Sequence, residues 1–204
     1  MRSLLFPLLI FISGCALFKT QAPVPAVITT ETEGPRAIKA EATVELKNEK
    51  TVTGRAIILA KTPGSFRIEV KGPLGQTVLV LASNGETLTV FSKGESNTYH
   101  MGDPAIPYSF TPGELVAFLL GETGAREGFT VKKSLDGRAF EAVKFINEKP
   151  AVRVLMSDFR TTSGVALPYA ITVEDGEKTL AIRYSKVEIN PEVKEALFKI
   201  AVEP

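Results

Sequence analysis

The sequence has few of the residues on which enzymes and metal sites most often depend. Its 204 residues include one histidine, His100, one cysteine, Cys15, and no tryptophan. A lone histidine and a lone cysteine provide no metal-ligand pair, and no Gly-x-Ser-x-Gly nucleophile motif occurs. We therefore expect neither an enzyme nor a metal site, and we interpret His100 as a structural residue.

An excess of charge of either sign is also absent. Lys and Arg number 24 and Asp and Glu 23, which gives a formal net charge of +1. A nearly neutral chain lacks the basic surface of a nucleic-acid binder, so no nucleic-acid partner is expected. Asp136, Asp175 and Glu177 fall in predicted turns and are interpreted as solvated. No phosphate-binding loop is predicted, because Pro73 removes an N–H from the Gly72–Gly75 segment.

Hydrophobic periodicity after residue 36 is mainly of the β type. With 44% apolar residues, the chain can form one compact domain with a full core. A long antiparallel meander must curl to protect its edges, which favours an open barrel over a flat sheet, although a sandwich interior also fits. Gly54 is a possible bulge. The predicted strands are 40–46, 52–60, 66–70, 78–82, 88–91, 98–101, 129–133, 139–146, 151–156, 165–173 and 179–189.

Two helices are predicted beside these strands. In the first, Thr111 is the N-cap, Pro112 takes the first helical position, Glu114 completes a capping box and Gly121 ends the helix. The second covers 192–198. The fold class is therefore mainly β, an incomplete antiparallel barrel of ten to eleven strands with helices as a lid over an apolar cavity; plain core packing of the first helix is the alternative. The apolar sides are formed by Leu115, Phe118, Leu119 and Leu120 in the first helix and by Val193, Leu197 and Phe198 in the second.

The stretch from Phe66 to Phe91 contains the most unusual feature of the sequence. Two predicted strands are joined there by the turn Gly72-Pro73-Leu74-Gly75. Turn tips usually carry small or polar residues, so a leucine at this position needs a reason. Leu74 either folds back to close the end of the core or points outward toward a membrane or an apolar ligand.

The N-terminal residues resemble a bacterial lipoprotein signal. Arg2 precedes an apolar run over 4–12, which is too short to span a bilayer because a spanning helix needs about 20 residues. The sequence Ser13-Gly14-Cys15 then resembles a lipobox, which implies a signal peptide over 1–14 and a covalent lipid on Cys15. Such an anchor is effectively permanent. By resemblance to the enterobacterial sorting rule, Ala16 favours the outer membrane.

Residues 15–35 are expected to form the lipidated cysteine and a flexible tether. This stretch includes three prolines and shows no sustained apolar period. At about 3.3 Å per residue, the tether spans at most about 65 Å. The folded domain is then 36–204, and no cofactor other than the lipid on Cys15 is expected.

The turn and the first helix together resemble those of the LolA/LolB-like lipoprotein family, and of its LolB outer-membrane receptors in particular. The resemblance lies in Pro73-Leu74-Gly75-Gln76-Thr77 and in Ile106-Pro107-Tyr108 leading to 115–121, and it covers most of 36–189. It implies a half-barrel that accepts lipoprotein acyl chains from a LolA-type periplasmic carrier and inserts them into the outer membrane. The protein would be a monomer that faces the periplasm.

The resemblance also assigns roles to particular residues. Pro73, Leu74 and Gly75 would form a membrane-insertion loop with Leu74 exposed. The chain departs from the family in having Gly72 where an asparagine is expected and in lacking tryptophan. Two alternatives remain, a lipid-binding lipoprotein that carries a glycolipid or phospholipid and a non-enzymatic envelope-assembly lipoprotein with a filled core. The residues assigned to the acyl-binding cavity are Phe66, Ile68, Val80, Phe118 and Leu119.

Overall fold

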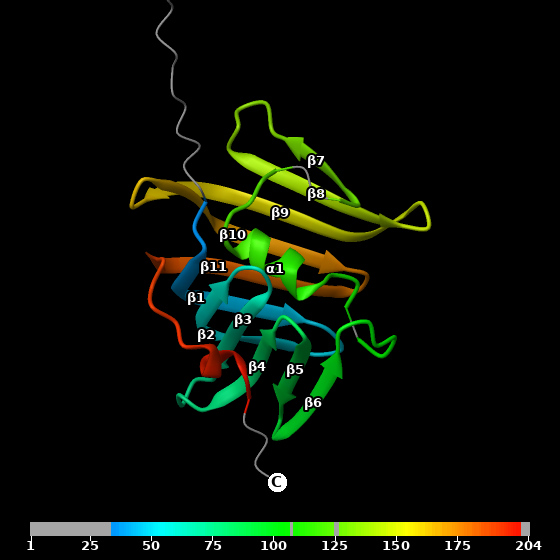
Figure 1. The fold of residues 1–204 in the computed structure, drawn as a ribbon, viewed down its shortest axis with the longest axis vertical. Coiled ribbons are helices and arrows are strands. Elements are labelled where there is room, and N and C mark those ends of the chain that lie inside the picture. The colour runs from blue at the N-terminus through cyan, green and yellow to red at the C-terminus, as the bar shows by residue number, and fades with distance from the viewer. Residues whose placement is uncertain (1–33, 107, 125–126, 201–204) are drawn as a thin grey trace, which may run out of the picture. The chain divides into compact units, whose positions relative to one another are not determined.

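The computed structural model describes residues 34–106, 108–124 and 127–200, which form a single antiparallel sheet of eleven strands around one short helix (Figure 1). The helical elements are α1, Pro112–Leu119, and a 3-10 turn, η1, Glu195–Phe198. The strands are β1 Ala37–Lys47, β2 Thr51–Lys61, β3 Ser65–Lys71, β4 Thr77–Asn84, β5 Thr87–Ser92, β6 Glu95–His100, β7 Phe129–Lys133, β8 Ala139–Ile146, β9 Lys149–Thr162, β10 Val165–Asp175 and β11 Lys178–Ile189.

The sheet is built from two meanders that meet at its centre. Its order is β6-β5-β4-β3-β2-β1-β11-β10-β9-β8-β7, so the first and last strands of the chain pair with each other. The two edge strands, β6 and β7, do not pair with each other, so the sheet does not close. The predicted open barrel is therefore confirmed. The connection from β6 to β7 must cross the open side of the sheet, and α1 lies within it over β2, β3 and β10 (Figure 1).

Alternating and continuous apolar runs located the strands correctly, and the differences lie at two hairpins. We expected a long turn over 92–97, but β6 already begins at Glu95, because Lys93 and Gly94 both have positive φ and close a two-residue turn. Ser163 and Gly164 also have positive φ and close a two-residue turn between β9 and β10. As a result β9 extends to Thr162, beyond the predicted strand 151–156. A serine or lysine at positive φ is uncommon, and therefore the sequence did not indicate these tight turns.

The predicted capping of α1 is confirmed. The Thr111 hydroxyl accepts a hydrogen bond from the Glu114 N–H, and the Glu114 carboxylate accepts one from the Thr111 N–H. Gly121 follows the helix with a φ of +77°. Residues 115–120 are all buried, so α1 is enclosed on more sides than the predicted apolar stripe implied. Within the described residues, no helix is long and apolar enough to cross a membrane.

The concave face of the sheet and α1 share the main hydrophobic core. Each strand presents alternate residues to this face, as the period of two requires. The side chains interlock with those of α1, so burial of apolar surface stabilises the fold and holds the helix in place. The largest contributors include Ile38, Ile58, Phe66, Ile68, Met156, Leu167, Ile171, Ile182, Leu115, Leu119 and Leu120.

The convex face carries a second, smaller apolar cluster under the C-terminal segment. The turn η1 packs against β3 and β4, and Lys61 of β2 forms an ion pair with Glu195. The predicted terminal helix over 192–198 is wrong in extent, since only a four-residue 3-10 turn forms. Leu197, expected on the apolar side, is 47% exposed. The buried residues outside the main core include Leu59, Val80, Ala82 and Phe198.

Gly54 does not form a bulge, contrary to our expectation. The pairing of β1 with β2 runs through Gly54 without a register shift. A Cβ at this position would lie 2.2 Å from the Lys71 carbonyl oxygen and 2.9 Å from the Val70 side chain. Gly54 is therefore required by the close approach of β3, at the point where the β3–β4 pairing shifts register.

Candidate functional site

The β3–β4 turn presents Leu74 to solvent. The side chain of Leu74 is 92% exposed. The alternative in which this leucine folds back into the core is therefore excluded. A large apolar side chain that is kept in water at a turn tip is unusual, and it marks the turn as a candidate contact site.

Hydrogen bonds fix the backbone of this turn. The Gly75 N–H donates to the Gly72 carbonyl at 2.9 Å, and the Gly72 N–H donates to the Gln76 carbonyl at 2.8 Å. The Gln76 side-chain oxygen accepts from the Leu74 N–H at 3.1 Å. A Cβ on Gly72 would lie 2.6 Å from the Gln76 side chain and 2.9 Å from Val78, so a larger residue here must displace these side chains. The Leu74 side chain is therefore exposed to solvent, whereas hydrogen bonds fix the backbone that carries it.

A charged network lies behind the turn on β3. Glu69 accepts hydrogen bonds from Arg67 Nη2 at 2.9 Å and from the Thr77 hydroxyl at 3.1 Å, and Lys71 Nζ lies 2.5 Å from its carboxylate. The contact with Lys71, followed by those with Arg67 and Thr77, lowers the pKa of Glu69 to about 2. Glu69 therefore stays ionised through the physiological range and ties the end of β3 to the start of β4.

The interior beneath α1 is nearly filled. An apolar cavity there has a volume of about 20 Å³, which is close to one water-sized sphere. Sites for ligands of drug size usually measure about 300–1,000 Å³. Neither this cavity nor the smaller one beside Phe118, of about 10 Å³, has room for an acyl chain. The apolar lining of this cavity is formed by Leu46, Phe66, Leu81, Leu88, Tyr108, Phe110, Leu115, Val173 and Leu180.

The predicted cavity residues do not share one space. Phe66 lines the cavity beneath α1, whereas Phe118 lines a second, smaller one toward β7. Ile68 and Leu119 are fully buried in the main core. Val80 was assigned to the wrong face, because it pairs with Glu69 in the β3–β4 register and therefore points to the convex side. Because β4 carries apolar residues on both faces, the sequence did not indicate which face Val80 occupies.

Aromatic and charged groups border the cavity beneath α1. The rings of Tyr108 and Phe110 are 5.1 Å apart, and Lys178 Nζ lies 5.3 Å from the centre of the Tyr108 ring. Burial raises the pKa of the Tyr108 hydroxyl, and the negative charge of Asp175 adds to the rise. This border is the least apolar part of the cavity wall.

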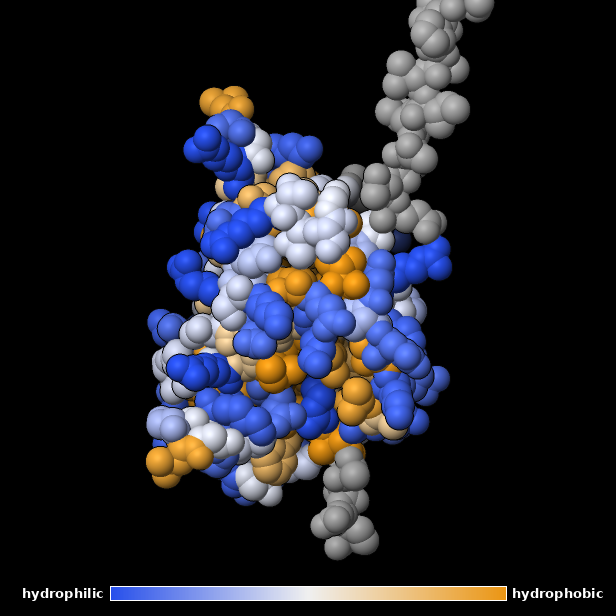
Figure 2. Space-filling model, turned by 90° about the vertical axis from the view of Figure 1, so that its left-hand side faces the viewer, coloured by the Kyte–Doolittle hydropathy of each residue, from blue (hydrophilic) through white to orange (hydrophobic). Residues whose placement is uncertain are grey.

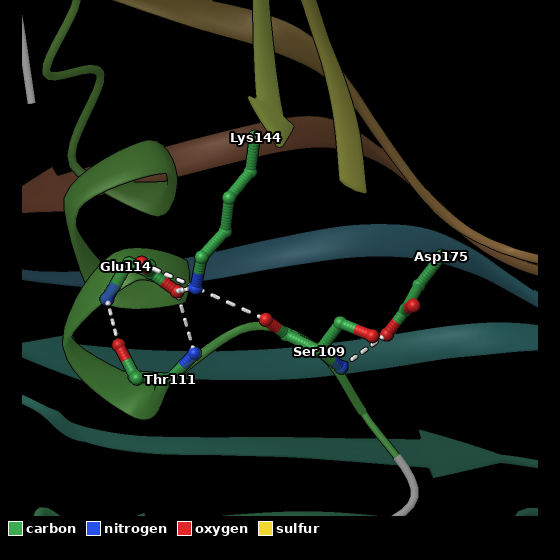
Figure 3. A network of polar contacts seen from close by, with 5 residues as sticks. All are labelled: Ser109, Thr111, Glu114, Lys144 and Asp175. Carbon is green, nitrogen blue, oxygen red and sulfur yellow. Dashed lines mark hydrogen bonds and ion pairs between the residues drawn. The ribbon is translucent and has the colours of Figure 1, made fainter. Parts of the chain in front are cut away.

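A polar latch holds the segment that leads into α1 against β8 and β10; we use the name for Ser109, Glu114, Lys144 and Asp175 (Figure 3). Lys144 Nζ donates to the Glu114 carboxylate at 2.8 Å and to the Ser109 carbonyl at 3.0 Å. The Ser109 N–H donates to Asp175 at 2.6 Å. The side chains of Lys144 and Glu114 are only 18% and 12% exposed, so loss of either partner leaves a poorly hydrated charge.

The C-terminal end of α1 has a polar contact of its own. The buried Tyr184 hydroxyl donates to the Leu119 carbonyl at 3.1 Å. Burial alone raises the pKa of Tyr184, so the hydroxyl remains protonated and able to donate. Both ends of α1 are therefore bonded to the sheet.

The sequence did not reveal several of these residues. We interpreted Asp175 as a solvated turn residue, but it accepts the Ser109 N–H. Leu135, at the β7–β8 turn, is fully exposed like Leu74, and the pattern Ser-Leu-Asp-Gly could have drawn attention to it. Figure 2 shows hydrophobic residues at two well-separated places on the outline of the molecule. Long-range partners such as Lys144 and Glu114 leave no local signal.

Other sequence predictions concern parts of the chain beyond this site. The signal peptide over 1–14, the lipidated Cys15 and nearly all of the tether over 15–35 lie outside the described residues. No group of three or more His, Cys, Asp or Glu side chains within the described ranges is arranged to hold a metal ion.

The sequence matches no protein-family model and no curated protein. The fold is similar to that of a DUF1329 family protein from Desulfovibrio piger, with a TM-score of 0.52, 12% identity, and coverage of 82% of this chain and 91% of that one. A putative outer membrane lipoprotein-sorting protein domain from Vibrio parahaemolyticus has a TM-score of 0.49, 9% identity, and coverage of 81% and 90%. A LolA superfamily protein from Nitrosomonas europaea has a TM-score of 0.46, 11% identity, and coverage of 81% and 91%.

At such identities only the fold is shared. The expected open antiparallel barrel is the architecture observed, and the resemblance to LolB receptors rests on the turn and helix motifs of the sequence.

Proposed function

We propose that this protein is a lipid-anchored receptor of the outer membrane that accepts lipoprotein acyl chains from a LolA-type periplasmic carrier and inserts them into the bilayer. The observation that carries the proposal is the exposed side chain of Leu74 on a turn with a fixed backbone. The leucine occupies the position that the family resemblance assigns to membrane insertion.

The energetics suit a repeated contact with the bilayer. Transfer of one leucine side chain from water to hydrocarbon yields about 1.5–3 kcal/mol, which biases contact without fixing the protein in place. The lipid proposed on Cys15 supplies the permanent anchor. Leu74 can then touch and leave the membrane while the body stays close to it.

Cargo binding requires α1 to move. The closed interior has room for about one water-sized sphere, so an acyl chain enters only if the segment over the core is displaced. This segment connects the two free edges, β6 and β7, and its displacement breaks no pairing between strands. The polar latch and the Tyr184 contact must release for this to happen. An acyl chain then passes from one apolar interior to another with little exposure to water.

A transfer assay tests the proposal. The soluble form, residues 16–204, lacks Cys15 and keeps all of the residues that the structure describes. We expect it to take an acylated lipoprotein from a LolA-type carrier and to deliver it to liposomes. The Leu74→Glu variant should accept the cargo and fail to deliver it. Delivery by that variant at the normal rate would remove Leu74 from the mechanism.

One observation favours a second candidate function. The filled interior also fits a non-enzymatic envelope-assembly lipoprotein that binds no acyl chain. Failure of the wild-type protein to accept cargo from the carrier would support this reading. Mass spectrometry of lipid that copurifies with the native protein separates both functions from carriage of a glycolipid or phospholipid.

A further inference from the structure

A groove runs along the base of the Leu74 turn where β2 meets β3. It has a volume of about 500 Å³. Its walls come from Thr53, Gly54 and Arg55 of β2, from Lys71 of β3, and from the backbone of the turn. None of its lining residues, all of which lie in the described part of the chain, is acidic. The groove is therefore open, positively charged and continuous with the turn that carries Leu74.

Two cations face each other across this groove without enough negative charge to balance them. Arg55 is paired with Lys71 in the register of β2 and β3, and like charges directly opposite each other are destabilising. Lys71 shares the single carboxylate of Glu69 with Arg67. The Arg55 side chain makes no hydrogen bond and no ion pair within the described residues. Arg67 and Lys71 thus share one carboxylate, and Arg55 has none.

No carboxylate lies directly opposite Arg55 on the neighbouring strand. On β1 its register partner is Thr43. Glu41 lies opposite Ile57, and Glu45 lies opposite Thr53. An arginine without an ion pair beside a lysine that shares its carboxylate with Arg67 is suited to an anion that arrives from outside.

The position of the groove indicates where such an anion comes from. Lys71 is three residues from Leu74, so at about 3.3–3.6 Å per residue the two lie within about 10 Å of each other. The headgroup layers together add only about 10–15 Å to a hydrocarbon core about 30 Å thick. If Leu74 enters the hydrocarbon, the groove is placed at the level of the lipid phosphates.

We propose that the groove formed by Arg55, Lys71 and Thr53 binds the phosphate group of a membrane phospholipid while Leu74 is inserted. Arginine provides a planar fork of donors that matches phosphate oxygens, and lysine adds a point charge. The Thr53 hydroxyl supplies a further donor. This inference rests on the proposed role of Leu74, because insertion brings the groove to the phosphate layer. The groove then determines the orientation in which the β3–β4 turn meets the bilayer.

Vesicle binding by residues 16–204 tests the inference, with Arg55→Gln as the variant and Arg138→Gln as the matched control. Arg138 lies at the β7–β8 turn, so its substitution removes the same charge far from the groove. On vesicles of phosphatidylcholine and phosphatidylglycerol we expect Arg55→Gln to weaken binding about fivefold, the contribution of one basic residue at an anionic membrane. Arg138→Gln should bind like wild type. On vesicles of a neutral galactolipid, which has no phosphate, wild type and Arg55→Gln should bind equally.

Three outcomes would overturn the inference. The first is equal binding of Arg55→Gln and wild type to the phospholipid vesicles, the second is equal weakening by both arginine variants, and the third is a defect of Arg55→Gln that persists on galactolipid. Binding of 10 mM inorganic phosphate that depends on Arg55, together with equal binding of wild type and Arg55→Gln to phospholipid vesicles, would identify a site for free phosphate and refute the lipid source. Leu74→Glu in the same assay keeps the two proposals apart. A loss with Leu74→Glu but not with Arg55→Gln refutes only the groove. A loss with Arg55→Gln alone refutes the insertion of Leu74 and, with it, the placement of the groove by that insertion.

Discussion

Two turns of this protein end in an exposed leucine, and they are built in different ways. At the β3–β4 turn, Leu74 lies on a backbone held by hydrogen bonds, and a Cβ on Gly72 would collide with the side chains of Gln76 and Val78. At the β7–β8 turn, the Gly137 N–H likewise donates to the Ser134 carbonyl, and Asp136 also accepts from the Ser134 hydroxyl and from the Arg138 N–H. A Cβ on Gly137 would meet no atom within 4 Å.

The difference shows that exposure alone does not identify a functional leucine. The turns lie at opposite ends of their strands, as the antiparallel order of the sheet requires. The Leu74 turn has an open basic groove at its base. The proposed membrane contact is therefore placed at Leu74, and Leu135 serves as the internal control.

The largest expected effect concerns the two leucines themselves. Leu74→Glu should weaken binding of residues 16–204 to neutral vesicles about 10- to 100-fold, because insertion of one leucine yields about 1.5–3 kcal/mol and each 1.4 kcal/mol is a factor of ten. Leu135→Glu should have no effect in the same flotation assay. Equal losses of vesicle binding in the two variants would show that the two leucines contribute equally to membrane contact.

The second prediction concerns the foundation of the Leu74 turn. Gly54→Ala should lower the free energy of unfolding by about 2 kcal/mol, because the new methyl group collides with the Lys71 carbonyl and forces the backbones apart. Gly124→Ala is the control, since nothing lies within 4 Å of a Cβ there. Urea unfolding followed by circular dichroism measures both. An undisturbed Gly54→Ala protein would mean that β3 and β2 are not closely apposed.

A third test compares the glycines of the two turns. Gly72→Ala and Gly137→Ala should each cost about 1 kcal/mol, the first through contact with Gln76 and the second through its φ of +68°. Adding Gln76→Ala should recover part of the loss at Gly72 and none at Gly137. A double-mutant cycle measures this coupling. Absence of coupling between positions 72 and 76 would contradict the described packing.

The smallest expected effect is the pH dependence at Glu69. Because its pKa is lowered from 4.5 to about 2, the ionised carboxylate stabilises the fold above pH 4.5, and that stabilisation is lost as the pH falls toward 2. Between pH 6 and pH 3 the wild type should lose about 1 kcal/mol more unfolding free energy than Glu69→Gln, since exposure to solvent weakens the interaction. Asp136→Asn, at the exposed Leu135 turn, should change this pH dependence less. Urea titrations of the three proteins at both pH values measure these differences in unfolding free energy.

Local patterns predicted most of the fold. The strand positions and the capping box of α1 depend on residues close in sequence, and the structure confirms them. Contacts between distant residues were not predictable. Val80 lies in an uninterrupted apolar run, so only its register with Glu69 reveals which face it occupies. Asp175 looked like an ordinary turn residue because its partner, Ser109, is 66 positions away.

The candidate site was predicted to the same extent. The turn around Leu74 was identified from its own residues, and its exposure agrees with one of the two alternatives stated for it. The filled interior corresponds to the stated alternative of a filled core. The sequence could not decide between a filled and an empty interior, because periodicity shows which side chains face inward but not how much volume they leave. The cations of the groove were overlooked because Arg55 and Lys71 are brought together only by strand pairing.

The pairing of β1 with β11 has a consequence for how the chain folds. These two strands lie near the ends of the described chain but at the middle of the sheet, and Asn190 adds side-chain hydrogen bonds to the N–H groups of Arg36 and Ala37. Each meander can assemble from short hairpins, yet the two join only when the last strand arrives. Pairings between such distant segments form slowly, since a long loop must first close. Until that step, β1 and β10 present unsatisfied edges, and a chain cut short before β11 would remain two separate, aggregation-prone halves.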